Sequence, residues 1–258
     1  MDMQLKGRRA LVTGSGKGIG RGIALALAAE GVKVAVNYNY NPATAEETMK
    51  MIEEVGGEAV LIKADVSTSE GCKYLVEEAA RQLGGLDILV NNAALQTNND
   101  LDEYSEERYD LLMSTNLKGY WNCTRFAVPF LKESDHGRVV YISSVHGKRP
   151  TDFDPVYAMT KGAIKMLVRE AAIELAQYKI TCNALLPGGV KIEFKTQVEG
   201  ASNFKRVPHT RKRQYMGYPL GRGGLPSDLA YMVCCLASPL SEHITGSSLR
   251  MDGGAMLL

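Results

Sequence analysis

The chain has 258 residues, long enough to build a large hydrophobic core in one or two domains. Hydrophobic residues make up 45% and charged residues 23%, as in soluble globular proteins, and a net charge of +1 gives no overall field to attract nucleic acid or an anionic membrane. The first residues lack the apolar core of a signal peptide, and no apolar run approaches the roughly 20 residues of a membrane span, so we expect a cytoplasmic protein. Five scattered cysteines without a C-x-x-C pair favour reduced thiols and argue against a metal site.

Short runs of aliphatic and β-branched residues alternate with helix-length amphipathic stretches along the chain. The predicted strands are 9–14, 32–38, 58–65, 86–93, 137–144, 180–187 and 249–252. Their near-continuous Val, Ile and Leu content is typical of a parallel sheet that is covered on both faces. The alternation predicts βαβ units with right-handed crossovers, and therefore a doubly wound (Rossmann) α/β fold. We find no repeat or linker and expect a single domain over 1–258.

Three sequence features mark expected helix starts, and one long stretch interrupts the alternation of strands and helices. Pro42 suits the first turn of a helix, and the pairs Thr44–Glu47 and Ser67–Glu70 have the spacing of capping boxes. A long irregular stretch at about 190–220 precedes the last helix and strand. Insertions at the carboxyl ends of strands often form substrate lids, so we expect a lid there.

The first predicted strand leads directly into a glycine-rich turn with the sequence TGSGKGIG. Gly14, Gly18 and Gly20 allow the backbone to turn tightly and to approach a pyrophosphate closely. A helix that begins at about Ile19 points its N-terminal N–H groups at that anion. The spacing is G-x-x-x-G-x-G rather than G-x-G-x-x-G and is also compatible with an ordinary turn, but the strand before it and the helix after it favour nucleotide binding.

The end of the second predicted strand bears on the choice between NAD and NADP. The residues at 37–40 are NYNY, without the acidic side chain that binds the ribose 2′-hydroxyl in many NAD enzymes. Lys17 in the glycine-rich turn is suited to pair with a 2′-phosphate, and we expect Ser15 and Asn37 to add hydrogen bonds. The sequence therefore predicts NADP(H) as the preferred cofactor, with NAD(H) possible. The alternative is that Lys17 is only a solvated charge.

Tyr157 and Lys161 lie four residues apart, a spacing that places both side chains on one face of a helix. A free tyrosine has a pKa near ~10, and a cation a few ångströms away favours the phenolate. We therefore expect Lys161 to lower the pKa of Tyr157, which makes the pair a candidate acid/base. The same spacing is common on solvated helix faces, so its meaning depends on the rest of the chain.

Seven short motifs occur in order and together carry a family resemblance. They are TGSGKGIG, Asp65 in KADVS, NNAA at 91–94, Asn116 in STNLKGY, ISS ending at Ser144, the Tyr157–Lys161 pair and PGG at 187–189. In this combination the chain resembles the short-chain dehydrogenase/reductase family over essentially its whole length. The resemblance implies a seven-stranded sheet, a nicotinamide cofactor and hydride transfer at an alcohol or carbonyl carbon, without a metal.

The resemblance also implies roles for four catalytic residues. Tyr157 is the acid/base, and Lys161 lowers the tyrosine pKa and hydrogen-bonds the nicotinamide ribose. Ser144 donates to the substrate oxygen, where negative charge develops. Asn116 holds a water that links Lys161 to solvent; the alternative for Asn116 is a polar residue on a solvated helix face.

Cofactor contacts are expected along the same motifs, with Asp65 and Val66 at the adenine and 92–94 at the ribose. The cofactor-binding positions that we expect are Gly14, Ser15, Lys17, Gly18, Ile19, Gly20, Asn37, Asp65, Val66, Asn92, Ala93, Ala94, Tyr157, Lys161, Pro187 and Gly188. Two positions depart from the family pattern: Ala94 replaces a glycine, and Ile192 stands where a threonine often bonds the carboxamide. Ala94 adds a methyl group close to the cofactor, and Ile192 puts the nicotinamide end of the lid in doubt.

The substrate is less clearly indicated than the reaction. The stretch SSVHGKRP and the ending DGGAMLL look most like the bacterial glucose 1-dehydrogenase branch, so a sugar, a polyol or a related hydroxy/keto compound is the first hypothesis. We expect Ser144, Tyr157 and His146 to contact this substrate, although His146 could equally face water. A basic cluster in the expected lid would favour an anionic substrate unless it is simply solvated; it comprises Lys205, Arg206, His209, Arg211, Lys212 and Arg213.

Two other functions share these motifs. A 3-oxoacyl thioester reductase uses the same fold and the same four catalytic residues. A non-catalytic regulator that senses NADP(H) is a more remote alternative, because such proteins often lose the tyrosine or the lysine. The family resemblance further implies a homotetramer, with segments 103–133 and 155–178 packing against a second copy.

Overall fold

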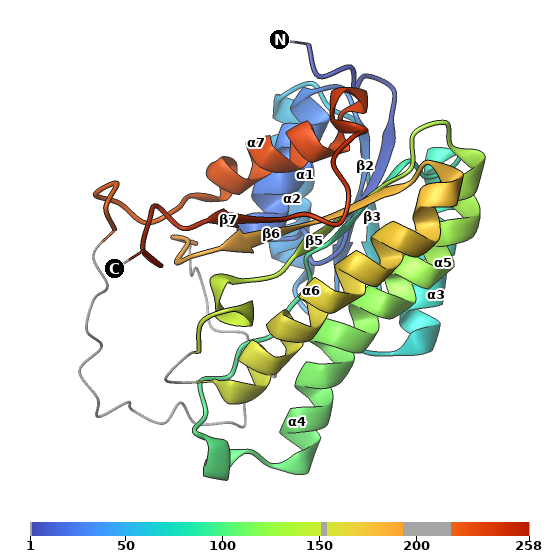
Figure 1. Ribbon diagram of the computed structural model, residues 1–258. Coiled ribbons are helices and arrows are strands. Elements are labelled where there is room, and N and C mark those ends of the chain that lie inside the picture. Colours follow the sequence, from blue (N-terminus) through green and yellow to red (C-terminus); the bar gives the residue numbers. More distant parts are fainter. Residues whose placement is uncertain (1, 151–153, 193–217, 258) are drawn as a thin grey trace.

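A seven-stranded sheet with every strand pair parallel forms the centre of the protein in the computed structural model, which describes residues 2–150, 154–192 and 218–257 (Figure 1). The strand order is β3-β2-β1-β4-β5-β6-β7, so the chain winds outward from β1 in one direction and from β4 in the other. The strands are β1 (Arg9–Val12), β2 (Lys33–Tyr38), β3 (Ala59–Lys63), β4 (Ile88–Asn91), β5 (Arg138–Ile142), β6 (Thr181–Pro187) and β7 (Ser248–Met251). All seven predicted strands and the doubly wound fold are confirmed.

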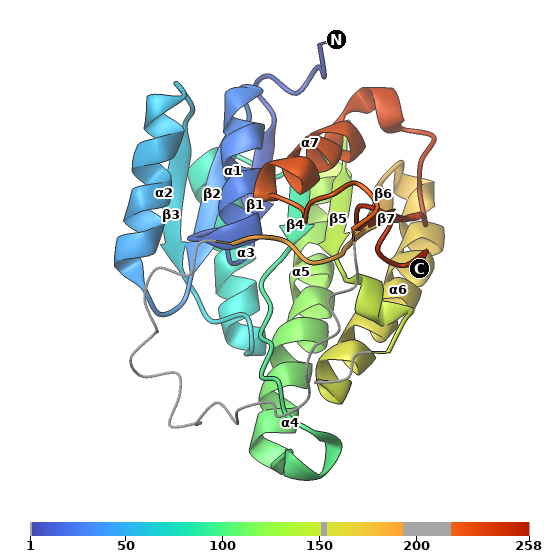
Figure 2. The same ribbon diagram turned by 90° about the vertical axis from the view of Figure 1, so that its left-hand side faces the viewer.

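Helices cover both faces of this sheet, as the two views show (Figures 1 and 2). The helices are α1 (Gly18–Ala29), α2 (Pro42–Glu54), α3 (Ser69–Leu83), α4 (Glu106–Met113), α5 (Gly119–Glu133), α6 (Pro155–Leu175) and α7 (Pro226–Ala237). On one face α1, α2 and α7 contribute to one apolar core, and on the other face α3, α5 and α6 contribute to a second. These two cores fix the carboxyl ends of the strands relative to α6, the helix that carries Tyr157 and Lys161.

The helices form because their apolar residues recur at helical spacing. In α3, for example, Cys72, Leu75, Val76 and Ala79 are completely buried and lie on one face of the helix. Most of the intervening residues of α3 are exposed or half-buried. Burial of this face against β3 and α5 therefore accounts for most of the stability of the helix.

Two predicted helix starts were placed wrongly. The N-cap of α2 is Asn41, whose side chain accepts from Thr44 N, and the N-cap of α3 is Thr68, which accepts from Gly71 N. Several residues with good capping side chains lie close together in both segments, and tertiary packing decides which of them begins the helix. Pro42 does occupy the first turn of α2, as predicted.

The expected lid lies mainly outside the described residues, because only its two ends, 190–192 and 218–220, are included. The residues that flank the lid are joined by a parallel bridge between Val190 and Gly224, which lies just after the second end. Beside this bridge, Lys191 N donates to Gly224 O at 2.8 Å. The basic cluster at 205–213 also lies outside the described residues. Among the helices of the described part, none is long and apolar enough to cross a membrane.

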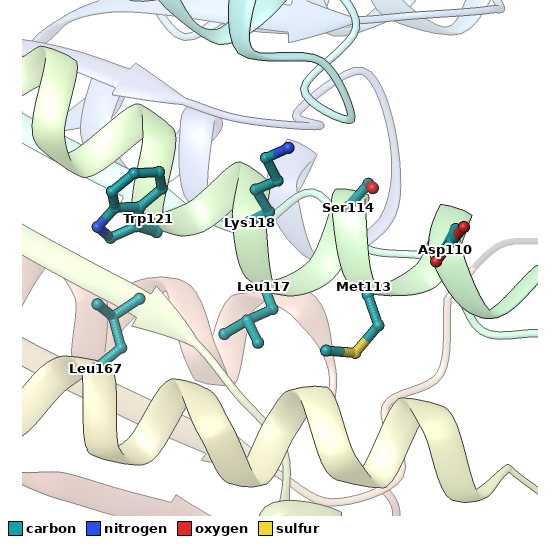
Figure 3. A pocket seen from close by; sticks show the side chains of 7 residues that line it. All are labelled: Asp110, Met113, Ser114, Leu117, Lys118, Trp121 and Leu167. Atoms are coloured by element: carbon teal, nitrogen blue, oxygen red, sulfur yellow. The ribbon is translucent and has the colours of Figure 1, made fainter.

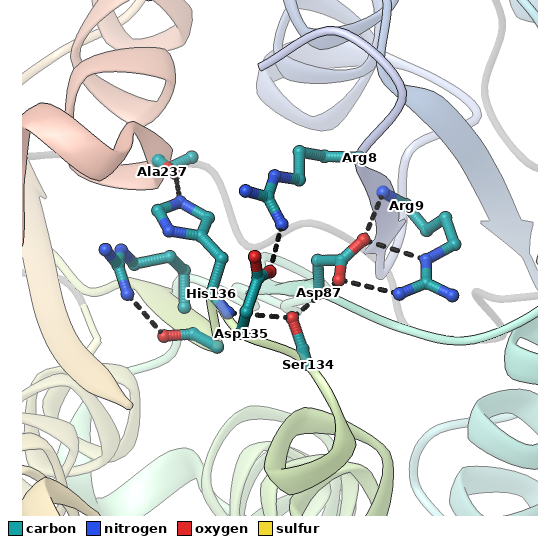
Figure 4. Close-up of polar contacts among 9 residues, drawn as sticks. Arg8, Arg9, Asp87, Ser134, Asp135, His136 and Ala237 are labelled. Carbon is teal, nitrogen blue, oxygen red and sulfur yellow. Dashed lines mark hydrogen bonds and ion pairs between the residues drawn. The ribbon is translucent and has the colours of Figure 1, made fainter. Parts of the chain in front are cut away.

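A polar network closes the amino-terminal edge of the sheet, opposite the glycine-rich turn (Figure 4). The Asp87 carboxylate at the start of β4 is 2% exposed and accepts two hydrogen bonds from the Arg9 guanidinium, each 2.8 Å long. Ser134 Oγ donates to the same carboxylate at 2.6 Å. Nearby, the buried His136 ring shares a 2.6 Å hydrogen bond with Ala237 O, which ties the start of β5 to the end of α7.

The Asp87 carboxylate is stabilised by these hydrogen bonds. Burial raises the pKa of Asp87, but the hydrogen bonds from Arg9 and Ser134 outweigh burial and hold the pKa below its ordinary value. Because the folded pKa is below the unfolded one, this stabilisation is present above about pH 4 and is lost as the pH falls through the folded pKa.

We predict that Asp87→Asn lowers the free energy of unfolding by about 3 kcal/mol at pH 7, since it leaves Arg9 without its charged partner. The variant should also lose less stability than the wild type on acidification below about pH 4. Urea unfolding at several pH values measures both effects. Glu58→Gln is the matched control, because its ion pair with Lys33 is exposed and worth less than about 1 kcal/mol. Equal effects of the two substitutions would contradict the prediction.

Candidate active site

Two glycines bring the turn after β1 against the end of β4. Gly14 has a φ of +63°, and a Cβ atom there would lie 2.8 Å from Ala93 Cα. A Cβ atom on Gly20 would lie 2.5 Å from Asn92 Nδ2 and 2.6 Å from Gly14 O. No side chain fits at either position, so the tight turn expected from the sequence depends on these two glycines.

The N-terminus of α1 faces out of this turn without a side-chain cap. Lys17 is the extended residue before the helix; it is exposed and makes no capping hydrogen bond. The first turn of α1, which begins at Gly18 and includes Ile19, contains no acidic residue. The partial positive charge of the helix end is therefore not neutralised by a neighbouring carboxylate, an arrangement that suits a bound phosphate group.

The side chains of Ser15 and Asn37 hold the turn in place from below. Ser15 Oγ donates to Val12 O at 2.7 Å, and Asn37 Nδ2 donates to Ala64 O at 3.2 Å, among other carbonyls. Asn37 Oδ1 accepts from Gly14 N at 2.9 Å. Both residues are at most 2% exposed and their donors are occupied within the protein. In this structure both side chains support the loop, and the expected hydrogen bonds from them to a 2′-phosphate stay a prediction.

The residues expected at the ribose and the adenine lie beside the same turn. Asn92 Nδ2 donates to Thr13 O at 2.9 Å, and Ala93 N donates to Thr13 Oγ1 at 3.0 Å, so the ends of β1 and β4 are joined. Ala94 is exposed.

At the end of β3, Asp65 Oδ1 accepts from Ser67 N at 2.9 Å, and Val66 is 7% exposed. The sequence thus brings the cofactor positions of four strand ends to one edge of the sheet.

The helix α6 carries the predicted catalytic pair. Its N-cap is Asp154, whose carboxylate accepts from Tyr157 N at 3.0 Å, and Pro155 occupies the first turn. Lys161 Nζ lies 5.5 Å from the centre of the Tyr157 ring, which confirms that the two side chains share one face of the helix. Ser143 Oγ donates to Lys161 O at 2.8 Å and fixes the helix against the end of β5.

The predicted lowering of the Tyr157 pKa is wrong for this structure. Burial is the largest influence and raises the pKa of Tyr157 to about 12; a hydrogen bond with Ser144 lowers it, and the Asp154 charge raises it further. Burial also disfavours the lysine cation and lowers the pKa of Lys161 to about 7. A four-residue spacing reveals proximity but not desolvation, and here desolvation dominates. At neutral pH Tyr157 is therefore a phenol, the form that donates a proton.

Lys161 is held by groups that the sequence did not suggest. Its Nζ donates to Ile142 O at 2.9 Å and to Tyr120 Oη at 3.4 Å. Lys161 as a whole is 1% exposed. Tyr120 Oη in turn donates to Ile142 O at 3.1 Å. Tyr120 lies four residues after Asn116, on the inner face of α5, and this spacing is the one signal that would have placed it near the site.

Ser144 and His146 follow the carboxyl end of β5, beside α6. Ser144 is 5% exposed, and its Oγ accepts from His146 N at 3.2 Å in the short turn Val145–Gly147. A Cβ atom on Gly147 would lie 2.4 Å from Lys161 O, so the turn packs directly on the catalytic helix. His146 is half-buried. The structure thus brings Ser144, Tyr157 and Lys161 together, with His146 next to them.

Asn116 occupies a π-helical turn, Ser114–Lys118, between α4 and α5 rather than the middle of a regular helix. Its side chain is completely buried, and it accepts from Leu95 N and donates to Leu95 O, both at 2.8 Å. The solvated-face alternative for Asn116 is therefore wrong. The amide positions the segment after β4, and single π-turns of this kind are frequent at functional sites.

The segment after β6 completes the edge of the site. Pro187 ends β6 and is buried, and Gly188 N donates to Met251 O at 2.9 Å. Ile192 Cγ2 lies 3.5 Å from the position of a Cβ atom on Gly18, so this side chain lies against the glycine-rich turn.

Comparison with known proteins agrees with this geometry. A sequence model described as "Enoyl-(Acyl carrier protein) reductase" matches residues 14–256. The chain is 38% identical to "Short chain dehydrogenase/reductase AacuN" of Aspergillus aculeatus, over 97% of this chain and 96% of the relative. It is 33% identical to "Glucose 1-dehydrogenase 2" of Bacillus subtilis, over 100% and 98% of the two chains. A solved short-chain dehydrogenase from Burkholderia cenocepacia J2315 in complex with NADP superposes with a TM-score of 0.87 and 31% identity, covering 98% of this chain and 99% of that one.

The chain therefore belongs to the short-chain dehydrogenase/reductase family. It is an oxidoreductase that acts on CH–OH or carbonyl groups.

Proposed function

We propose that the protein is an NADP(H)-dependent oxidoreductase that interconverts a secondary alcohol and a ketone, with Asn116, Ser144, Tyr157 and Lys161 as its catalytic residues. The observation that carries this proposal is the half-buried Tyr157, whose phenol is hydrogen-bonded with Ser144 and whose ring centre lies 5.5 Å from Lys161 Nζ, beside a glycine-rich turn at the same edge of the sheet. Bound nicotinamide supplies or accepts the hydride. No other described residue is needed as the proton donor.

The protonation state of Tyr157 suits the reductive direction. Reduction of a ketone produces an alkoxide, and the neutral phenol is the group that protonates it. Ser144 donates to the same oxygen as its charge develops. Oxidation of an alcohol requires the phenolate, whose population rises with pH because the pKa of Tyr157 lies at about 12. Burial makes both states sensitive to any charge placed near the ring.

The preference for NADP(H) rests on charge around the glycine-rich turn. No carboxylate follows β2 at positions 37–40 to bind the 2′-hydroxyl or to repel a 2′-phosphate. Lys17 is exposed next to the open N-terminus of α1 and can reach solvent-facing groups. With Ser15 and Asn37 occupied inside the protein, the proposal assigns the attraction for the 2′-phosphate to Lys17.

We predict that Lys17→Ala raises the Kd for NADPH about tenfold and leaves the Kd for NADH unchanged, since a charge-assisted contact to phosphate contributes about 1.5 kcal/mol. Titration of nicotinamide fluorescence measures both constants. Lys33→Ala removes an exposed lysine at the other end of β2 and serves as the control. An equal loss of affinity for both nucleotides, or a wild-type preference for NADH, would refute the assignment.

For the substrate we propose a sugar, a polyol or a related hydroxy/keto compound. The full-length similarity to a glucose 1-dehydrogenase and the position of His146, two residues after Ser144, support this class. A 3-oxoacyl thioester reductase is the second candidate, and the description of the matching family, which refers to an acyl carrier protein, supports it. A polyhydroxylated substrate needs hydrogen-bonding partners near the reacting carbon, whereas a thioester needs a long open groove.

The test is the rate of NADP+ reduction with D-glucose, compared with the rate of NADPH oxidation with acetoacetyl-CoA. Turnover of D-glucose supports the sugar class, and turnover of acetoacetyl-CoA alone supports the thioester class. In either case Tyr157→Phe should abolish turnover and leave NADPH binding within about twofold, because it removes one hydroxyl proton donor from a packed ring. A variant that keeps most of its activity would overturn the catalytic role of Tyr157.

We also propose that the protein is a homo-oligomer, a homotetramer by family resemblance, with α4, α5 and α6 against a second copy. Trp121, Met166 and Ile173 on these helices are 46%, 53% and 75% exposed, which is unusual for such apolar side chains. A pocket of about 480 Å³ is lined by Met113, Leu117, Trp121 and Leu167, among other residues, and so shares Trp121 with this apolar surface. Figure 3 shows the side chains that line it. A matching surface of a second copy would cover both features.

Accordingly, we expect Trp121→Glu together with Ile173→Glu to dissociate the assembly, because two charges would be buried against apolar groups. Light scattering at micromolar protein concentration gives the mass of the wild type and the variant. A monomeric wild type would overturn the oligomer proposal. A matched substitution away from this face, Tyr74→Glu on α3, should leave the mass unchanged.

A further inference from the structure

The Asp154 carboxylate, at the start of the catalytic helix, is completely buried and accepts hydrogen bonds from two separate segments. One is its own helix, through Tyr157 N at 3.0 Å. The other is the segment after β4, through Thr97 N at 2.8 Å and Asn98 N at 3.1 Å. Tyr104 Oη donates to the same carboxylate through a very short hydrogen bond. A single side chain therefore joins the catalytic helix to a loop that is more than 50 residues away in the sequence.

The number of protons in this cluster fixes the direction of its hydrogen bonds. The Tyr104 hydroxyl has one proton, and it goes to Asp154. Thr97 Oγ1 lies 2.8 Å from Tyr104 Oη and 3.5 Å from Asp154 Oδ2; since Tyr104 gives its own proton to Asp154, the threonine hydroxyl donates along the shorter contact. Burial and the Asp154 charge both raise the pKa of Tyr104, which keeps the phenol protonated at any working pH. Thr97 therefore donates to Tyr104, and Tyr104 donates to the Asp154 carboxylate.

The loop itself is built to be held at these points. Asn116 fixes its first residue, Leu95, through two hydrogen bonds, and the buried Arg108 donates to Asn99 Oδ1. Between them, Asn98 has a φ of +57°, in the left-handed region, which asparagine adopts more readily than most residues other than glycine. The Thr97 and Asn98 N–H groups donate to Asp154 at 2.8 Å and 3.1 Å and hold this turn.

Asp154 also influences the reacting group electrostatically. Among the described residues, the charged or titratable groups around Tyr157 are Lys161 on the same helix, Tyr120 on α5, Asp154 at the N-cap and His146, which adjoins Ser144. Of these, Asp154 carries the negative charge, which opposes formation of the phenolate. The loop and the acid/base therefore respond to the same carboxylate.

We propose that Asp154 is a positioning residue that locks the loop 95–104 onto the first turn of α6, next to the acid/base Tyr157, and that this loop, which continues from the carboxyl end of β4, forms a wall of the substrate site. The lock itself stands on the described contacts, whereas its consequence for turnover rests on the proposed catalytic role of Tyr157. Tyr104 and Thr97 complete the lock from the side of the loop.

Three variants separate the parts of this proposal. Tyr104→Phe removes a hydroxyl and leaves the Asp154 charge. Asp154→Asn removes the charge but keeps a side chain that caps helices equally well, so α6 still begins at the same place. Asp102→Asn makes the same chemical change at an exposed position of the same loop and is the matched control.

The first measurement is amide hydrogen exchange of the NADPH-bound protein, which requires no substrate. Peptides that cover 95–104 should exchange on the order of tenfold faster in Tyr104→Phe and Asp154→Asn, because a hydrogen bond to a buried charge is lost. Exchange in the strands β1 to β6 should stay unchanged, and Asp102→Asn should match the wild type. Wild-type exchange at 95–104 in both variants, or faster exchange throughout the chain, would overturn the lock.

The second measurement is kcat/KM against pH for oxidation of D-glucose, or of 3-hydroxybutyryl-CoA if the thioester alternative holds. Alcohol oxidation rises with pH as Tyr157 loses its proton, and we call this rise the alkaline limb of the profile. Asp154→Asn should move the alkaline limb to lower pH by on the order of one unit, since a negative charge near the phenolate is removed. Tyr104→Phe should raise KM with the limb in place, and Asp102→Asn should change neither. An unmoved limb in Asp154→Asn would refute the link to Tyr157. Absence of turnover with either alcohol would count against the proposed function, and the exchange data would still decide the lock.

Discussion

The carboxyl edge of the sheet is governed by one constraint: backbone groups beyond the ends of parallel strands need hydrogen-bonding partners once they are buried. Here buried side chains supply those partners. Asn37 bonds Gly14 N, Asn92 bonds the Thr13 and Gly14 carbonyls, and Asn116 bonds both backbone groups of Leu95. Each amide offers a donor and an acceptor at a fixed separation, which suits a loop that exposes one of each. The glycine-rich turn and the segment after β4 are therefore held in place by the protein itself.

The same burial that rigidifies the edge controls its electrostatics. Tyr157 and Lys161 are neighbours, yet the pKa of the tyrosine rises to about 12 and that of the lysine falls to about 7. Proximity alone would shift the tyrosine in the opposite direction, so desolvation is the larger effect. The pKa of the buried Lys161 lies near neutrality, so its charge responds strongly to any charge added nearby, because the surrounding dielectric screens it weakly. The Lys161 amine is also fixed in position, because it donates to Tyr120 Oη and Ile142 O.

The sequence predicted what depends on periodicity and motif, and missed what depends on burial. Alternating aliphatic runs placed all seven strands, and the i, i+4 spacing placed Tyr157 and Lys161 on one face of α6. The direction of the Tyr157 pKa shift was missed, because spacing carries no information on desolvation. Ser15 and Asn37 were assigned to the cofactor from their position in the motif, whereas their donors point into the protein. The Asp154–Pro155 pair is a recognisable helix start, but its contact with Tyr104 requires the tertiary fold.

Different side chains provide the hydrogen bonds for buried polar groups at the two edges of the sheet. At the amino edge, Asp87 and Arg9 form an ion pair at the starts of β4 and β1, whereas Ser144 follows the carboxyl end of β5. At the carboxyl edge, neutral amides hold the loops, and the first turn of α1 has no acidic residue. A carboxylate beside that helix end would cancel the partial charge that attracts a phosphate. Two buried carboxylates do lie at this edge: Asp252 follows β7 and accepts from Gly254 N and Met256 N, and Asp154 caps α6, where its charge acts on Tyr157. Neither belongs to the first turn of α1, so the partial positive charge of that helix end stays available to a phosphate.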